Sequence, residues 1–286
     1  MQYTIKKLTE CTIQEAVMAW NRGFEGYFVQ IEMTPDMFFN RLVNEGLSLS
    51  DSVVVFDQKE PIAIVVNGFR TVEGKKTAWN GGTGIAPEYR GKGVSQLLME
   101  ETLKIYQENG VEAATLEAIK ENEKAIRLYQ RFGYEIIDSL VFLSGAPKGT
   151  NVNPIQAESI RPEKLPLLPF YKENVPWQCQ WQSVKSGEAQ VYYSKSGNPL
   201  GYGLYKKVWN QNGQLEKVFL YQVKLLADVN VQNINAILAA ITENADNTVN
   251  FTIINGAISN SVIQHLMDLG FNKTTEQVQM LKKITE

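Results

Sequence analysis

Residues 84–98 read GIAPEYRGKGVSQLL, a strand that runs into a glycine-rich turn and then into the start of a helix. The first turn of a helix has backbone N–H groups without partners and carries the positive end of the helix dipole, so it binds anions such as phosphate. Gly91 and Gly93 allow close approach and positive φ. Arg90 and Lys92 add positive charge. The glycines alone are also compatible with an ordinary strand-to-helix turn that has a basic rim.

This turn lies inside a regular succession of predicted elements. Hydrophobic periodicity, capping residues and turn residues predict the order β-α-α-β-β-β-α-β-α-β over the first half of the chain. The expected strands cover residues 3–8, 52–56, 61–69, 76–85, 111–119 and 134–143, and the expected helices cover residues 12–24, 34–46, 95–109 and 122–132. The order favours an α/β fold.

Two motifs of this region resemble those of one family. The turn fits neither the P-loop nor the dinucleotide-binding glycine pattern. Residues 90–95, RGKGVS, instead resemble motif A of the GNAT superfamily of N-acetyltransferases, with Ser95 in place of a final Gly or Ala. A second GNAT pattern is matched in register by Leu116, Glu117, Asn122, Ala125, Leu128, Tyr129, Gly133 and Tyr134. Residues 19–27, AWNRGFEGY, also resemble the opening of bacterial tandem-GNAT proteins.

The resemblance implies a fold and a cosubstrate. The fold would be α/β (α+β), with two tandem GNAT folds, each a mixed, mostly antiparallel central sheet flanked by helices. The cosubstrate would be acetyl-CoA, without a metal. The amides of residues 91–96 would hold its pyrophosphate, residues 83–85 would pair with the pantetheine arm as an added strand, and Asn122, also a favoured N-cap, would contact the pantetheine amides. The implied cofactor-binding residues are Thr83, Gly84, Ile85, Arg90, Gly91, Lys92, Gly93, Val94, Ser95, Gln96 and Asn122.

The resemblance also implies roles in the transfer of an acetyl group to an amine. A backbone N–H near Ile85 would polarise the thioester carbonyl. Tyr129 would be the general acid that protonates the leaving thiolate, because a phenol keeps its proton at neutral pH; the alternative is an aromatic core residue. Glu117 would be the general base. Its alternatives are a strand carboxylate paired with a neighbour and deprotonation through water, since residues 76–85 carry no carboxylate.

The acceptor is expected beside the first two helices. Aromatic and acidic residues gather there and would suit a cationic amine, either a small molecule or part of a peptide. They are Trp20, Phe24, Tyr27, Phe28, Phe38, Phe39, Glu25, Glu32 and Asp36. The alternative is that most of these aromatic residues belong to the core. The alternative function for the whole chain is a non-catalytic acyl-CoA-binding or sensing module.

The second half of the chain repeats the first in a diverged form. Residues 191–193 and 199–201 echo residues 53–55 and 61–63 at an offset of 138, and residues 265–271 echo residues 128–134 at an offset of 137. Two anchors at nearly the same offset predict a tandem duplication.

The duplication predicts domains at residues 1–148 and 149–286. Residues 228–233 replace the phosphate turn without Gly, Arg or Lys, and Leu266 replaces Tyr129. We therefore expect the second copy to keep the fold without binding CoA.

Composition limits the other functions. The chain has 286 residues, with 28 Lys and Arg against 31 Asp and Glu, and a net charge of -3 argues against nucleic-acid binding. One histidine, His265, expected to be structural, and two separated cysteines argue against metal and disulfide sites. Neither a signal peptide nor a membrane-spanning apolar run is expected, and the cysteine usage suits the cytoplasm. The sequence leaves the oligomeric state open.

Overall fold

The computed structural model describes residues 3–28, 32–147, 155–226, 231–243 and 249–284. These residues fall into two compact units. The first consists of Met1–Ile137 and Gln279–Glu286, and the second of Asp138–Val278. The domain boundary expected between residues 148 and 149 lies outside the described residues. The units differ from the expected domains because strand β6 (Glu135–Gly145) belongs mainly to the second unit, while the end of β12 (Asn272–Lys283) belongs to the first.

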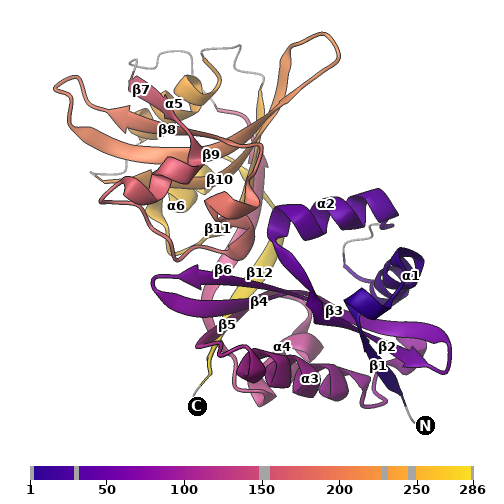
Figure 1. Ribbon diagram of the computed structural model, residues 1–286. Helices are drawn as coiled ribbons and strands as arrows, with labels where there is room; N and C mark the ends of the chain where they lie inside the picture. Colours follow the sequence, from indigo (N-terminus) through magenta and orange to yellow (C-terminus); the bar gives the residue numbers. More distant parts are fainter. Residues whose placement is uncertain (1–2, 29–31, 148–154, 227–230, 244–248, 285–286) are drawn as a thin grey trace. The chain divides into compact units, whose positions relative to one another are not determined.

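The first unit is a sheet with helices on both faces. Its strands lie in the order β1-β2-β3-β4-β5, and the end of β12 follows β5. Figure 1 shows α1 and α2 on one face of this sheet and α3 and α4 on the other. The strands are β1 (Thr4–Lys7), β2 (Leu47–Asp57), β3 (Glu60–Val72), β4 (Lys75–Ile85) and β5 (Ala113–Ile119), and the helices are α1 (Ile13–Gly23), α2 (Pro35–Glu45), α3 (Val94–Glu108) and α4 (Glu123–Arg131).

The caps of α1 and α2 follow the sequence signals. The Thr12 side chain accepts a hydrogen bond from the backbone N–H of Glu15, whose carboxylate returns to the Thr12 N–H, and this is a capping box. Thr34 caps α2, Pro35 occupies its first turn, and Gly46 ends it with φ of 65°. Both predicted helices are confirmed, within two residues at each end.

Strand β4 separates from β5 halfway along its length. The two strands pair in parallel from Thr77 and Ala113 to Asn80 and Leu116. There a register shift against β3 leaves Gly81 as an extra residue, a β-bulge. In the described part of the chain, residues 82–85 pair with β3 but not with β5. The bulge therefore leaves a gap in the pairing of the two parallel strands beyond Asn80 and Leu116.

Helix α1 covers the glycine-rich part of β4 at very short range. A Cβ atom added at Gly84 would lie 2.9 Å from the Phe24 ring, and one added at Gly23 would lie 2.7 Å from the Gly84 backbone. Trp20 and Phe24 stack on each other, with ring centroids 4.3 Å apart. The glycines of β4 thus let a helix and its aromatic side chains lie directly on the strand.

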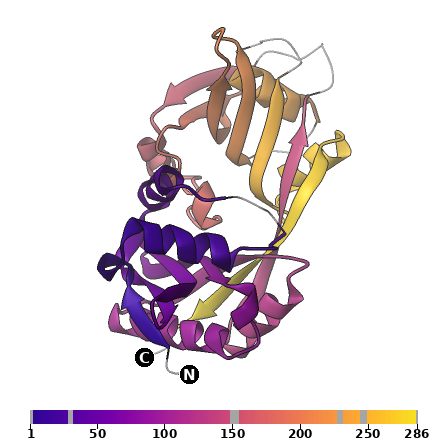
Figure 2. The ribbon, with the colours of Figure 1, turned by 90° about the vertical axis from the view of Figure 1, so that its right-hand side faces the viewer.

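The second unit has a similar sheet, but different segments pack on its two faces. Its strand order is β12-β6-β11-β10-β9-β8-β7, and Figure 2 shows β9, β10 and β11 side by side in orange and gold. The remaining strands are β7 (Gln156–Ile160), β8 (Glu188–Tyr193), β9 (Pro199–Trp209), β10 (Leu215–Leu225) and β11 (Asn250–Ala257), and the helices are α5 (Val231–Ile241) and α6 (Ser261–Asp268). Both helices contribute to one core cluster, which indicates that they cover the same face of the sheet.

On the other face, the described residues form no counterparts of α1 and α2. Three 3₁₀ turns, Pro162–Leu167, Trp177–Cys179 and Trp181–Ser183, occupy the chain between β7 and β8. Leu165 and Val184 pack there against Tyr202 and Leu204 of β9. The predicted repeat therefore holds for the sheet but not for these two helices. None of the described helices is long and apolar enough to cross a membrane.

Buried phenols predict that the fold loses stability in alkali. Burial raises the pKa of Tyr129 to about 12, and it also raises the pKa of Tyr106 and Tyr134. Unfolded tyrosines ionise near pH 10, so above about pH 10 the unfolded state binds fewer protons than the native state and is favoured. We expect the urea midpoint to fall between about pH 8 and about pH 11.

Tyr134→Phe provides the check. The Tyr134 hydroxyl is buried and has no hydrogen-bond partner among the described residues. Its removal should raise the free energy of unfolding at neutral pH by about 1 kcal/mol and reduce the alkaline loss. An alkaline loss as steep as in the unmodified chain would show that this phenol is not buried in solution.

Candidate active site

The turn before α3 presents free backbone N–H groups to open space. Gly93 is the N-cap with φ of 85°, and the first helical bond runs from the Leu97 N–H to the Gly93 carbonyl at 3.1 Å. The N–H groups of residues 94–96 therefore have no acceptor within the helix. A Cβ atom added at Gly91 or Gly93 would have no neighbour within 4 Å. The turn can receive an anion, as its sequence predicts.

Arg90 does not behave as a mobile cation at this turn. Its guanidinium donates to the carbonyl of Ile85 at 2.9 Å, to that of Glu25 at 2.8 Å and to that of Gly23 at 3.3 Å. Carbonyls at the end of a helix are natural partners of a cation. Arg90 thus fastens the end of α1 to the turn, whereas the exposed Lys92 has its Nζ 5.6 Å from the centroid of the Tyr89 ring.

Strand β4 offers one unpaired edge beyond its bulge. Thr83, Gly84 and Ile85 pair with Val65, Ile64 and Ala63 of β3, and within the described residues their other edge has no strand beside it. An extended chain can bind such an edge through backbone hydrogen bonds. In the chain, only the 3₁₀ turn Pro87–Tyr89 separates this edge from the open turn before α3.

Four polar side chains from three parts of the chain, β4, α4 and the segment after α1, lie near this gap. Burial raises the pKa of both Tyr129 of α4 and Tyr27 of the segment after α1. Thr83 of β4 lies close enough to Tyr129, and Asn122, the N-cap of α4, close enough to Tyr27, to lower each pKa in part. The Asn122 side chain also accepts from the N–H of Ala125 at 3.2 Å. Both readings of Asn122, a helix cap and a polar group at the site, are therefore compatible with its geometry.

Tyr129 is a buried phenol with its proton firmly held. Burial raises its pKa to about 12, against a smaller opposite effect of the Thr83 hydrogen bond. The Tyr129 ring also packs edge-on against the Tyr134 ring, with centroids 6.0 Å apart. The residue serves the core and still has its hydroxyl at the gap, where it can donate a proton.

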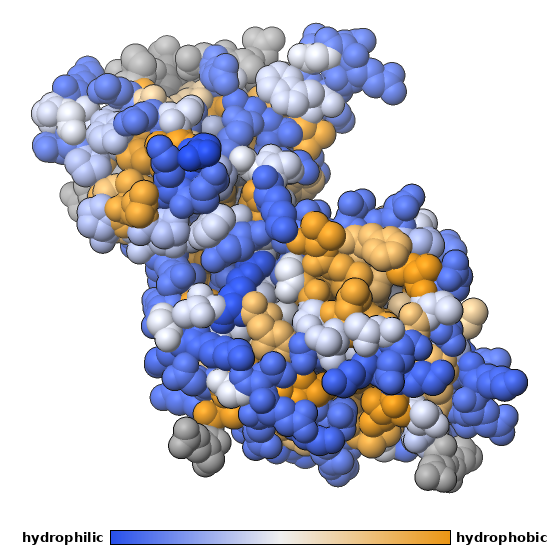
Figure 3. All heavy atoms as spheres, in the orientation of Figure 1, coloured by the Kyte–Doolittle hydropathy of each residue, from blue (hydrophilic) through white to orange (hydrophobic). Residues whose placement is uncertain are grey.

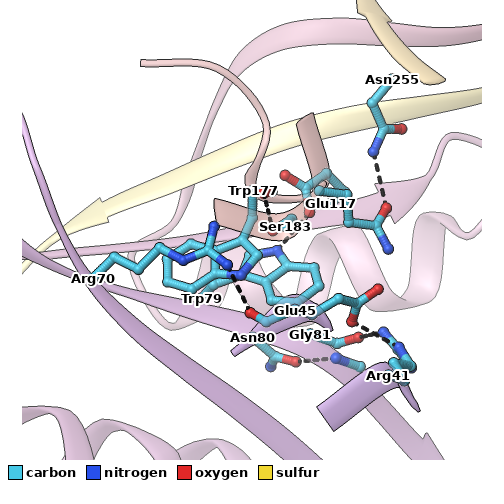
Figure 4. A network of polar contacts seen from close by, with 12 residues as sticks. Arg41, Glu45, Arg70, Trp79, Asn80, Gly81, Glu117, Trp177, Ser183 and Asn255 are labelled. Atoms are coloured by element: carbon cyan, nitrogen blue, oxygen red, sulfur yellow. Dashed lines mark hydrogen bonds and ion pairs between the residues drawn. The ribbon is translucent and has the colours of Figure 1, made fainter. Parts of the chain in front are cut away.

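Glu117 lies on β5 directly after the last residue that pairs with β4. The indole Nε1–H of Trp79 donates to one carboxylate oxygen of Glu117 at 2.7 Å (Figure 4). Charge-assisted hydrogen bonds of this kind fix the orientation of a carboxylate. Glu117 is thus a strand carboxylate paired with a neighbour, as one alternative expected, and it is also half-buried at the mouth of the gap.

Arg41 of α2 is a structural residue of the site that sequence reasoning missed. Its guanidinium stacks over the Trp20 ring at 4.5 Å, pairs with Glu45 at 2.8 Å and donates to the carbonyl of the bulge residue Gly81 (Figure 4). Arg70 of β3 reaches the Glu45 carbonyl at 3.0 Å. The sequence shows only that Arg41 precedes Glu45 by four residues. That spacing is common on exposed helices, so it does not indicate a role at the site.

The aromatic residues expected to bind an acceptor divide into two groups. Trp20 and Phe38 are core residues, whereas Phe28 and Phe39 are 57% and 51% exposed. Figure 3 shows apolar side chains gathered on the surface over α1 and α2. The exposed apolar residues in and beside these helices are Met18, Phe28, Met37, Phe39 and Val43. The surface beside the gap is therefore partly apolar.

The described part of the second unit has no counterpart of the Tyr129 phenol. Leu266 of α6 stands at the position of Tyr129 and is fully buried. Residues 228–230, part of the stretch that replaces the phosphate turn, lie outside the described residues. His265 is half-buried, with its Nδ1 3.1 Å from the Ser261 carbonyl.

Comparisons with known proteins bear on this arrangement. The family model described as acetyltransferase (GNAT) family matches residues 15–134. The first unit is a GNAT domain.

The whole chain is similar in fold to solved GNAT structures. One is a GCN5-related N-acetyltransferase from Anabaena variabilis, with a TM-score of 0.63, 17% identity and coverage of 99% of this chain and 73% of that one. A second, from Sphaerobacter thermophilus, has a TM-score of 0.63, 12% identity and coverage of 99% and 96%. A tandem GNAT protein from the clavulanic acid biosynthesis pathway has a TM-score of 0.62, 10% identity and coverage of 100% and 99%. No curated protein matches the chain. The expected fold, two tandem GNAT folds, is confirmed.

The turn of the GNAT domain can be tested by Gly93→Asp. An Asp at this position adds a negative charge and a side chain where the α3 N–H groups face open space, so we expect the Kd for CoA to rise about 100-fold or more. The measurement is CoA binding by calorimetry.

Gly74→Asp is the matched control. Gly74 has φ of 78°, and a Cβ atom there would also meet nothing within 4 Å, but it lies in the turn between β3 and β4. It carries the same backbone strain and charge, and CoA binding should stay as in the unmodified chain. Equal binding by both variants would refute the placement of the pyrophosphate at the α3 turn.

Proposed function

We propose that the chain is an acetyl-CoA-dependent N-acetyltransferase that moves an acetyl group directly to a primary amine. The observation that carries the proposal is the meeting of three features of the GNAT domain. The open N-terminus of α3 suits a pyrophosphate, the free edge of β4 suits the pantetheine arm, and the Tyr129 hydroxyl lies beside Thr83 on that same edge. Together these features supply a site for the pyrophosphate, an edge for the pantetheine arm and a proton donor for the thiolate.

The residues of the first unit fit acetyl-CoA. The N–H groups of residues 94–96 lack acceptors within the helix, and Gly91 and Gly93 leave open space above the turn. Thr83, Gly84 and Ile85 keep one backbone edge available within the described residues. In this proposal Lys92 supplies charge to the pyrophosphate, and Arg90 positions the turn rather than contacting it. When bound, acetyl-CoA supplies an acetyl thioester.

The residues around the gap then hold and move two protons. Tyr129 holds a proton at its hydroxyl and donates it to the sulfur as the carbon–sulfur bond breaks, and the second proton that the nitrogen loses on forming the amide restores the phenol. Glu117 accepts the proton that the acceptor ammonium loses before its nitrogen bonds the carbonyl carbon. Trp79 keeps the Glu117 carboxylate in place through its 2.7 Å hydrogen bond. A backbone N–H near Ile85 polarises the carbonyl.

The acceptor surface in this proposal is formed by α1, α2 and the segment between them. Phe28 and Phe39 are its exposed aromatic residues, and Glu25 and Asp36 are exposed carboxylates of the same region. An apolar surface with carboxylates suits an amine with an apolar body, either a small molecule or a peptide end.

Tyr129→Phe tests the proposal. The variant keeps the ring in the core and loses the proton donor, so we expect kcat to fall about 100-fold or more while CoA affinity stays nearly the same. The measurement is release of free thiol from acetyl-CoA with a panel of primary amines. Tyr134→Phe, which removes a neighbouring buried phenol, is the control and should keep its kcat.

Equal turnover by Tyr129→Phe would remove Tyr129 from the acid role. Tight acetyl-CoA binding without turnover on any amine would refute the enzyme and favour a non-catalytic acyl-CoA-binding module.

A further inference from the structure

Asn80 is a buried amide at the point where β4 leaves β5. It is 5% exposed and is the last residue of β4 that pairs with both neighbouring strands, with Asn67 of β3 and with Leu116 of β5. Asn67 faces helix α3, because its Oδ1 accepts a hydrogen bond from the Tyr106 hydroxyl at 2.8 Å. Cross-strand partners share a face of a sheet. The Asn80 side chain therefore lies on the face that α3 and α4 cover.

The bulge brings the side chains of Asn80 and Thr83 together. In a regular strand, residues three positions apart point to opposite faces. The extra residue Gly81 shifts this alternation by one, so Asn80 and Thr83 point to the same face. Their side chains meet there, with the Asn80 Nδ2 2.9 Å from the Thr83 Oγ1. The bulge is thus the cause of this contact.

The orientation of the Asn80 amide follows from the backbone. The Gly82 N–H donates a hydrogen bond to this amide at 3.1 Å. An N–H group is only a donor, so the atom it meets is the oxygen Oδ1, and the nitrogen Nδ2 is turned to Thr83. The Thr83 oxygen is farther from Oδ1, at 3.1 Å, and two bonds to one amide cannot both be linear. The shorter contact, with Nδ2, leaves the hydroxyl hydrogen of Thr83 for another acceptor.

The oxygen of Tyr129 is an acceptor near Thr83. Burial raises the pKa of Tyr129 to about 12, and Thr83 lies close enough to the phenol to offset part of that rise. A donor to the phenol oxygen has this effect because it stabilises the phenolate. It also leaves the phenol hydrogen free for the sulfur. Without this donor the pKa of Tyr129 would be higher still, and the phenol would be a weaker acid.

A second contact holds the bulge independently of Asn80. Arg41 of α2 donates to the carbonyl of Gly81, the bulge residue itself. The Arg41 guanidinium is fixed in turn by its ion pair with Glu45 and by its position over the Trp20 ring. A change confined to the Asn80 Nδ2 should therefore leave the bulge, and with it the free edge of β4, in place.

We propose that Asn80 is a positioning residue of the transfer reaction. Its Oδ1 holds the bulge through the Gly82 N–H, and its Nδ2 turns the Thr83 hydroxyl so that the hydroxyl donates to the oxygen of Tyr129. Asn80 acts through Thr83 and not on the reacting atoms. This role rests on the acid function proposed for Tyr129.

Asn80→Asp and Thr83→Val test this role. Asp keeps an oxygen for the Gly82 N–H but has no donor for Thr83, whose hydroxyl then turns to the carboxylate and away from Tyr129. Val has the shape of Thr without the hydroxyl. We expect each variant to lower kcat about tenfold, which corresponds to about one pKa unit of the acid. The KM of the amine and the Kd for CoA should stay as in the unmodified chain. The measurements are thiol release with the panel of amines and calorimetry with CoA.

The effects of the two changes should not add. If Asn80 acts through Thr83, the double variant loses about tenfold in kcat, as each single variant does, and neither change lowers the residual turnover of Tyr129→Phe. Independent structural roles would give losses that multiply to about 100-fold. Thr77→Val is the matched control and should keep its kcat. Thr77 is a buried Thr of the same strand, and its hydroxyl donates to the Lys75 carbonyl at 3.2 Å.

The outcomes separate this role from the proposed function. Turnover that depends on Tyr129 but is unchanged in Asn80→Asp and Thr83→Val would overturn the role of Asn80 alone, and so would losses that multiply. No turnover by the unmodified chain, or full turnover by Tyr129→Phe, would refute the proposed acid and the role of Asn80 with it. If Asn80→Asp does not fold, Asn80→Ala takes its place, because it removes the amide without adding a charge, and the same results are expected of it.

Discussion

The parallel pairing of β4 with β5 stops at Asn80 and Leu116, and the functional side of the first unit depends on this stop. The extra residue Gly81 turns the following part of β4 away from β5 while β3 keeps its pairing. This change in the direction of β4 leaves a backbone edge free at residues 83–85, ahead of the open N-terminus of α3 in the chain. It also brings Thr83 beside Tyr129. Arg41 of α2 holds the bulge in place by donating a hydrogen bond to the Gly81 carbonyl.

The same bulge occurs in the second unit with other side chains around it. The glycines of β4 allow Trp20 and Phe24 to lie on the strand. The matching part of β10 carries Tyr221, Gln222 and Lys224 instead, and 3₁₀ turns replace the two covering helices. The duplicated backbone thus leaves the strands unpaired in both units, and in the second unit larger side chains reduce the space to a small, mostly apolar pocket.

Much of the first unit could be predicted from local signals. Thr12, Thr34 and Gly46 mark helix ends through short-range capping, and the glycine turn before α3 has the open geometry that its sequence indicates. The meeting of Thr83, Asn122 and Tyr129 followed only from the family resemblance, because it depends on how β4 packs beside α4, which lies in a separate part of the sequence.

Other features had no local signal. The hydrogen bonds of Arg90 to the end of α1 depend on how that helix lies on β4, and a basic residue beside a glycine turn looks like a phosphate ligand in the sequence. The loss of two helices in the second unit could not be seen because the echoes of the first copy fall only on its strands and last helix.

The central claim is that the first unit binds acetyl-CoA and the second does not. A calorimetric titration of the full chain with acetyl-CoA tests it most directly, through the number of sites per chain. We expect one site, and the loss of that site in Gly93→Asp. Two sites would show that the second unit has kept a CoA site, and the absence of any binding would show that the open turn before α3 does not serve acetyl-CoA.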